Sequence, residues 1–280
     1  MKGLGARLRW GIPISLAVIL VISLDLWAGG EGWGLTGLAL VFGLGALLEA
    51  IKLGTDKLGD RILGVVLFAG SFVLWSVPDC RSLIGFEDGI PMAWLLGLPL
   101  FLAPVITEAL PAIPKSRWRG SLHALLVSQW LVTPVLACVM VSVDPLGAHL
   151  FLCALIMIKG SDTGAYLIGR PFGRTPLHPV SPRKTVEGLL GAVGAACLLG
   201  VAYSLILQHE TFPVSQAIFF GVLAAVAGQL TDLQESAFKR AAGAKNSGET
   251  IPGLGGMLDM MDSLILAIPL IVWLRTLLQG

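Results

Sequence analysis

Charge is scarce in this sequence: Lys, Arg, Asp and Glu together make up 13% of its 280 residues, about half the share in a soluble globular domain. Hydrophobic residues make up 55%, and the mean hydropathy is +0.82. This composition excludes a disordered chain, a disulfide-rich secreted scaffold and a soluble enzyme, and it leaves a protein that crosses a membrane several times. The formal net charge of +1 gives no basic excess for binding a nucleic acid.

Cysteine is also scarce, with four residues in the chain. Cys138, Cys153 and Cys197 lie in apolar runs, and Cys80 lies in a polar connection. No two of them have the spacing of a zinc site, and they imply no disulfide framework. We therefore interpret them as small buried hydrophobic residues.

Long apolar runs dominate what is present, and a transmembrane helix needs about 20 mostly apolar residues. The sequence has nine candidate spans: residues 10–28, 34–51, 62–77, 91–110, 122–143, 146–158, 186–207, 214–230 and 262–278. The sixth is short, so eight spans are the nearest alternative. The first resembles a signal peptide, but no small-residue cleavage site closes it, and we interpret it as a retained helix. We therefore predict an all-α, polytopic membrane protein.

Basic residues are unevenly distributed among the connections between these spans. With nine spans and a cytoplasmic N-terminus, 17 of the 19 Lys and Arg residues fall on the cytoplasmic side, and only Arg81 and Arg275 fall outside. This bias follows the positive-inside rule, so we predict a multi-pass protein of the inner (plasma) membrane with its N-terminus in the cytoplasm. The two longest polar connections, residues 159–185 and 231–259, then face the cytoplasm.

The two parts of the chain differ in character. Residues 1–148 form apolar helices, about five spans, with short connections, and residues 149–280 hold both polar connections. We predict that the second part is the catalytic half of one integral membrane domain. In the first part, Glu49 and Glu108 lie near cytoplasmic span ends, where an acid can either reach water or serve a function.

The first polar connection predicts a phosphate site. Asp162 lies where the sixth span meets water, and the Gly and Pro residues after it predict a shaped loop. Ser181 as a cap, Pro182 in the first turn and Glu187 predict a helix start, whose free N–H groups can bind an anion. Three neighbours would strengthen that site: Arg183, Lys184 and Thr185. The alternative is a capped helix whose basic residues only follow the positive-inside rule.

The second polar connection places five polar residues on one helical face: Asp232, Glu235, Ser236, Lys239 and Arg240. Asp259 and Asp262 form a further acidic pair beside a Gly-rich turn. Such oxygen ligands suit Mg²⁺, and we predict that Asp232 and Asp259 hold it. For Glu235 alone, the favoured interpretation is a surface ion pair with Lys239.

These motifs resemble the phosphatidate cytidylyltransferases, also called CDP-diacylglycerol synthases. The C-terminal signature of that family is matched in register by Ser236, Phe238, Lys239, Arg240, Lys245, Gly248, Ile251, Pro252, Gly255, Gly256, Met257, Asp259, Met261 and Asp262. Residues 162–166, 169–170, 172–174, 181–188 and 228–236 are similar to the family as well. The resemblance is specific over roughly the last two fifths of the chain.

Three positions depart from the family pattern. Asn246 stands where the family has Asp, Leu254 where it has His, and Met260 where it has Arg. We hypothesise that Arg183 or Arg170 supplies the positive charge that Met260 lacks. A degenerate member that binds without turnover is an alternative that these departures leave open.

The resemblance implies an enzyme that transfers CMP from CTP to phosphatidic acid, giving CDP-diacylglycerol and pyrophosphate, with Mg²⁺ as cofactor. It implies catalytic roles for Asp232, Ser236, Lys239 and Asp259. It implies substrate binding by Asp162, Ser181, Arg183, Lys184, Thr185, Glu187, Arg240, Lys245 and Asp262. The expected partners are the two substrates and the lipid bilayer, with a homodimer left open.

Two rival functions remain at this point. A CTP-dependent polyprenol kinase is the nearest enzyme, and it would release CDP instead of pyrophosphate. A transporter usually has its ionisable site near the bilayer midplane, whereas the middles of these spans carry almost no charge. Transport is therefore the less favoured class.

Overall fold

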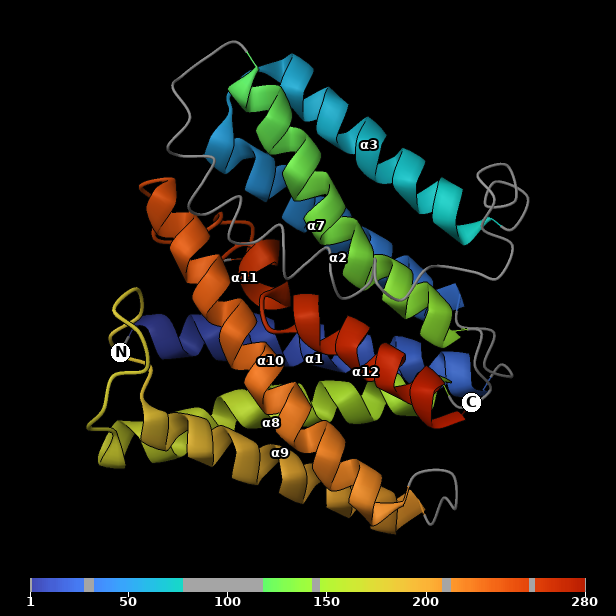
Figure 1. Cartoon of the computed structure of the whole chain (residues 1–280), viewed down its shortest axis with the longest axis vertical. Coiled ribbons are helices and arrows are strands. Elements are labelled where there is room, and N and C mark those ends of the chain that lie inside the picture. The colour runs from blue at the N-terminus through green and yellow to red at the C-terminus, as the bar shows by residue number, and fades with distance from the viewer. Residues whose placement is uncertain are drawn as a thin grey trace.

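The structure is a computed structural model that describes residues 2–27, 33–77, 118–142, 147–207, 213–251 and 255–279. The described residues form nine helices and no strand (Figure 1). The helices are α1 (Lys2–Trp27), α2 (Trp33–Gly54), α3 (Leu58–Ser76), α7 (Arg119–Ser142), α8 (Gly147–Phe172), α9 (Val186–Leu207), α10 (Val214–Ala241), α11 (Met257–Met261) and α12 (Leu264–Gln279).

Seven helical segments among the described residues are long and apolar enough to cross a membrane, and the last of them, Met257–Arg275, joins α11 to α12. In a bilayer the chain must satisfy its own backbone polar groups, and a helix does so within one segment. α1 contains a shorter apolar stretch, Leu16–Asp25. The predicted all-α, polytopic membrane fold is confirmed. The count of nine spans stays a prediction, because the span at 91–110 lies outside the described residues.

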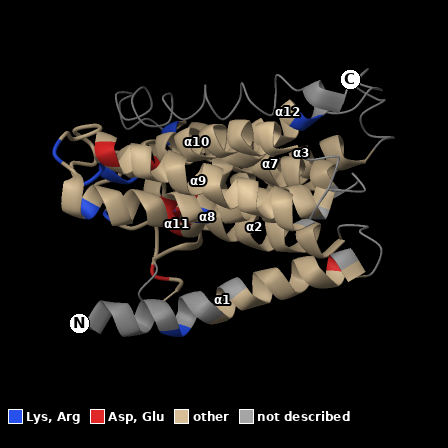
Figure 2. Ribbon diagram, turned by 90° about the horizontal axis from the view of Figure 1, so that it is seen from below, with Lys and Arg blue, Asp and Glu red and all other residues tan. Residues whose placement is uncertain are grey.

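The helices form a bundle with two groups on either side of a central pair. Helices α8, α9 and α10 pack together on one side and α2, α3 and α7 on the other, with α11 and α12 between them (Figure 1). α1 lies along the bundle and contacts α2 and α8 (Figure 2). In the most apolar stretch of α7, 72% of the residues are buried, compared with 22% in the corresponding stretches of α3 and α9. We infer that α3 and α9 face lipid over most of their surface.

Most of the charged residues drawn in colour lie at one end of the bundle (Figure 2). Contacts at that end join the last turns of α2 and α10 to the first turns of α3 and α7. The His123 Nε2 atom lies 3.0 Å from the Ala50 carbonyl oxygen, and the His123 ring stacks on Phe238. The Ser121 hydroxyl donates to Asp60 at 2.8 Å. Of these helices, α2 and α3 are joined by a short connection and run antiparallel.

α8 extends to Phe172, although the predicted sixth span ends at Ile158. The expected loop is therefore wrong for this stretch, because its glycines pack α8 against α9. A Cβ atom on Gly164 would lie 2.5 Å from the carbonyl oxygen of Gly191, and small residues allow such close helix contacts in a membrane. The Ser161 hydroxyl donates to the Ile158 carbonyl at 2.7 Å, which satisfies this polar group inside the helix.

α9 begins at Val186, so the predicted cap at Ser181 is wrong. The N–H of Gly188 donates to the Thr185 hydroxyl oxygen at 3.1 Å, which makes Thr185 the cap. The chain first reverses through a turn in which the Lys184 N–H donates to the Ser181 carbonyl at 3.0 Å. Ser181 thus shapes the turn that brings Lys184 back toward the bundle.

Candidate active site

Glu235 is the buried member of the polar face of α10, and Arg240 is its exposed end. The Glu235 side chain is 1% exposed, and the Lys239 ammonium group lies 2.5 Å from Glu235 Oε2 and 2.6 Å from Asp259 Oδ1. The expected pair of Glu235 and Lys239 forms, but its interpretation as a surface pair is wrong. This stretch of α10 faces the bundle, since Phe238 packs against His123 and Trp130 of α7 and Lys239 reaches Asp259 of α11.

One carboxylate oxygen in this cluster is left unpaired. Glu235 Oε1 is buried and has no hydrogen-bond partner among the described residues. Glu235 also interacts electrostatically with Asp259 and Asp262. An unpaired buried carboxylate oxygen among like charges is unfavourable, and either a bound cation or a proton on Glu235 would relieve it.

Asp259 organises the Gly-rich turn before α11. Its Oδ2 atom accepts the N–H groups of Ser247 at 3.1 Å and Gly256 at 2.8 Å, and it lies 2.9 Å from the Ser247 hydroxyl. Gly255 has φ of +102°, and a Cβ atom there would lie 2.5 Å from Asp259 Oδ2. Only glycine fits that position. The turn therefore fixes Asp259 so that its other oxygen meets Lys239.

Glu49 of α2 holds the same turn from the opposite side. Its side chain is buried, and its two oxygens accept the N–H groups of Met257 at 2.9 Å and Leu258 at 3.0 Å. The Ser247 hydroxyl lies 3.0 Å from Glu49 Oε2, and the Thr250 hydroxyl donates to Oε1. Glu49 comes from the part of the chain where no site residue was predicted. Its one signal in the sequence is an acid near the end of an apolar run.

A second cluster joins α8, α10 and the turn before α9. The Lys184 ammonium group lies 2.6 Å from Asp232 Oδ2, and both side chains are 19% exposed. Asp232 interacts electrostatically with Asp162 and with Asp262. Asp162 in turn lies 3.7 Å from the Lys159 ammonium group. The structure thus gathers three predicted acids beside two lysines, of which Lys184 was predicted and Lys159 was not.

The remaining predicted residues have other roles in the described part of the chain. Glu187 accepts the backbone N–H groups of Arg174 and Thr175, at 3.1 and 3.2 Å, and so closes the loop between α8 and α9. Arg240 donates to the Ala244 carbonyl at 2.9 Å. Arg240 is exposed, as are Arg183 and Lys245, and Ser236 is half-buried on α10.

Comparison with known proteins assigns this arrangement to a family. The model of the cytidylyltransferase family matches residues 10–278. The chain belongs to the cytidylyltransferase family. This match confirms the family predicted from the polar connections.

Three relatives of the chain are named phosphatidate cytidylyltransferase. The one from Synechocystis sp. is 42% identical over 134 residues, 48% of this chain and 45% of the relative. The one from Staphylococcus aureus (strain COL) is 41% identical over 128 residues, 45% of this chain and 48% of the relative. The one from Bacillus subtilis (strain 168) is 36% identical over 137 residues, 49% of this chain and 51% of the relative. The chain thus matches about half the length of these relatives.

Met260 departs from the cytidylyltransferase pattern and lies among the described residues. Leu254, which also departs from it, lies outside them. The Lys159 ammonium group lies 3.3 Å from the Met260 carbonyl oxygen. Arg170 instead lies over the ring of Tyr166, about 16 Å farther along α8 at 1.5 Å per residue. The structure thus places Lys159, and not Arg170, beside Met260. That Arg183 supplies the missing charge stays a prediction.

Proposed function

We propose that the protein is a phosphatidate cytidylyltransferase. In this reaction a phosphate oxygen of phosphatidic acid attacks the α-phosphorus of CTP, the bond from that phosphorus to the β-phosphate oxygen breaks, and pyrophosphate leaves. The observation that carries the proposal is the buried network of carboxylates and lysines at one end of the bundle, in a chain of the cytidylyltransferase family. The names of the relatives support the same reaction.

The carboxylates of this network suit Mg²⁺. Acids outnumber lysines in it: Glu49, Asp162, Asp232, Glu235, Asp259 and Asp262 accompany Lys159, Lys184 and Lys239. A bound cation would also relieve the unpaired Oε1 of Glu235. We propose that Asp232 is a ligand together with Asp262 or Asp259. A bound Mg²⁺ would neutralise phosphate charge on the substrates, and it usually keeps waters and few protein ligands.

The other polar residues would position the substrates. Phosphoryl and nucleotidyl transfer depend mainly on alignment and on neutralised charge. Lys184 and Lys239 carry ammonium groups inside the network, where they would contact phosphate oxygens. Exposed cations beside it would attract the triphosphate of CTP, namely Arg183, Arg240 and Lys245. The arrangement thus supports CTP arriving from water and phosphatidic acid arriving from the membrane.

The charged end of the bundle would face the cytoplasm of the inner (plasma) membrane, where CTP is available. The prediction is that, in a chain that also carries Cys80→Ser, a cysteine at Asn246 reacts with an impermeant maleimide only after permeabilisation of the cells. Asn246 is exposed beside the Gly-rich turn. The matched control is Val77→Cys, which follows the opposite end of α3 and should react in intact cells. Labelling of Asn246→Cys from outside would overturn this orientation.

Product analysis tests the proposed reaction. Purified protein in detergent, given radiolabelled CTP, phosphatidic acid and Mg²⁺, should form lipid-linked CMP and pyrophosphate in equal amounts. Release of CDP with a phosphorylated polyprenol would favour the kinase. If neither product forms and CTP still binds, the chain is a non-catalytic member of the family. The molecular mass of the purified protein in detergent tests whether it forms a homodimer.

A further inference from the structure

An apolar cavity of about 470 Å³ lies between α1, α2, α7, α8 and α12. Its lining includes Val18 and Ile19 of α1, Ala39 of α2 and Leu155 of α8. The size falls in the range of small-molecule sites, about 300–1,000 Å³. Lys159 is the one charged residue among the described residues that line it. An apolar cavity with a single cation suits an amphiphile with an anionic head.

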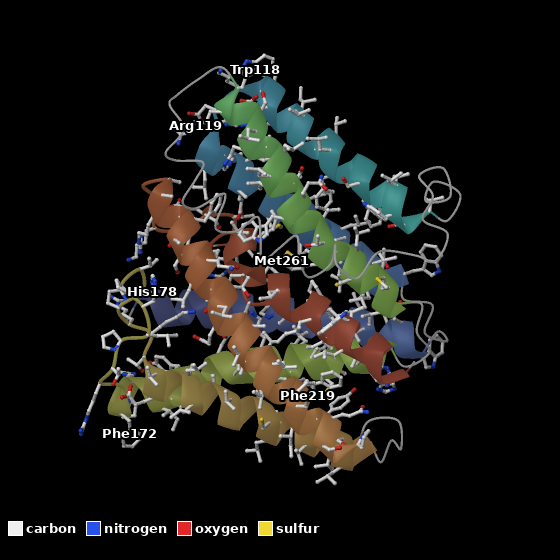
Figure 3. All side chains as sticks on the ribbon, in the orientation of Figure 1. Trp118, Arg119, Phe172, His178, Phe219 and Met261 are labelled. Carbon is white, nitrogen blue, oxygen red and sulfur yellow. The ribbon has the colours of Figure 1, made fainter. Side chains whose placement is uncertain are left out.

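The cavity ends at the candidate active site. Met260 and Met261 line it, and they stand between Asp259 and Asp262 in the chain. Figure 3 shows Met261 near the middle of the bundle, where α11 meets α12. A chain lying in this cavity therefore has its polar end beside the carboxylates that we propose to hold Mg²⁺. The cavity and the reaction centre share one wall.

Lys159 has capacity for a further ligand. Its ammonium group lies 3.0 Å from the Ser263 hydroxyl, 3.3 Å from the Met260 carbonyl and 3.7 Å from Asp162 Oδ2. The first two partners are neutral, and the Lys159 side chain is 45% exposed. A phosphate oxygen can therefore reach this ammonium group, and lysine binds phosphate well as a compact charge.

We propose that Lys159 and this cavity form the lipid substrate site: the ammonium group holds the phosphate of phosphatidic acid, and the cavity takes one acyl chain. This inference rests on the proposed function, and it assigns phosphatidic acid to the cavity beside Lys159. Because the Lys159 ammonium group lies beside the Met260 carbonyl, a lipid phosphate bound to it would lie close to the carboxylates around Asp262. The nucleotide then binds from the side of Lys184 and Lys239.

Steady-state kinetics separates the two substrates. Lys159→Met should raise the KM for phosphatidic acid at least about tenfold, the loss expected for one charged hydrogen bond, and leave the KM for CTP within about twofold. Lys159→Arg keeps the charge and should recover most of the affinity. An equal rise in both KM values, or no rise in the KM for phosphatidic acid, overturns the role of Lys159.

Chain length tests the cavity. Ala39→Phe adds a ring that fills the cavity, so it should lower kcat/KM for phosphatidic acid with 16-carbon chains at least about tenfold more than for 8-carbon chains. The matched control is Val41→Phe on the same helix, because Val41 is 59% exposed and does not line the cavity. The same effect from both variants, or no dependence on chain length, overturns the acyl-chain assignment.

Direct binding separates this inference from the proposed reaction. Radiolabelled dioctanoyl phosphatidic acid, mixed with the detergent-solubilised protein without CTP, should bind the wild type at least about tenfold more tightly than Lys159→Met. This result would support the lipid site even if the wild type formed no CDP-lipid. Equal binding of phosphatidic acid by the wild type and Lys159→Met contradicts the site, whatever the turnover.

Discussion

Asp232→Asn is expected to lower the turnover of CTP and phosphatidic acid by about a thousandfold, while the protein stays folded in the membrane. Asparagine keeps the shape of the side chain but removes one negative charge from the group that includes Asp162 and Asp262. A lost carboxylate ligand of Mg²⁺ should cost several kcal/mol of transition-state stabilisation, and about 4 kcal/mol corresponds to a thousandfold in rate. The measurement is kcat with both substrates saturating, over a range of Mg²⁺ concentrations.

A second observable and a control sharpen this test. Binding of Mn²⁺ in place of Mg²⁺, followed by electron paramagnetic resonance without substrates, should weaken in Asp232→Asn. The matched control is Asp56→Asn, because Asp56 is fully exposed and pairs only with Arg61 among the contacts described for it. The control should keep its turnover. Near-normal activity of Asp232→Asn at limiting Mg²⁺ would contradict the assignment of Asp232 to the metal.

The membrane spans could be predicted from the sequence because the bilayer imposes a length and an apolar composition on each helix. Their ends could not, because packing decides them. α8 passes through Lys159 and Asp162 because Gly164 meets α9 closely, and hydropathy does not contain that contact. The predicted span 186–207 coincides with α9, but its cap was misplaced, since the turn before α9 gives the capping role to Thr185.

The site was predictable where its residues share one segment. Lys239 and Glu235 lie one helical turn apart, so their spacing alone predicts a contact. Glu49 and Ser247 are 198 positions apart, and only the fold brings them together. The positive-inside rule places Lys159 at the cytoplasmic end of its span. Its position beside Met260, in contrast, depends on how α8 contacts α11. Contacts between distant segments are therefore what a single sequence leaves open.

Glu49→Gln is expected to lower kcat by about a hundredfold without removing any group that touches a substrate. The Glu49 oxygens accept two backbone N–H groups and face two hydroxyls, and an amide group would turn a donor toward some of these donors. Loss of charged hydrogen bonds in a buried site costs about 2–3 kcal/mol. That loss frees the turn that fixes Asp259 against Lys239.

The turn itself gives a readout that distinguishes positioning from general instability. Glu249 is exposed within it, so a protease that cuts after glutamate should cleave there faster in Glu49→Gln than in the wild type. Glu249→Gln is the matched control: it removes the cleavage site, keeps the Glu49 contacts and should leave kcat unchanged. Because the turn carries Asp259, the loss of kcat and the gain of cleavage in Glu49→Gln should appear together. A variant that loses activity while cleavage stays at the wild-type rate would show that Glu49 acts in some way other than by holding this turn.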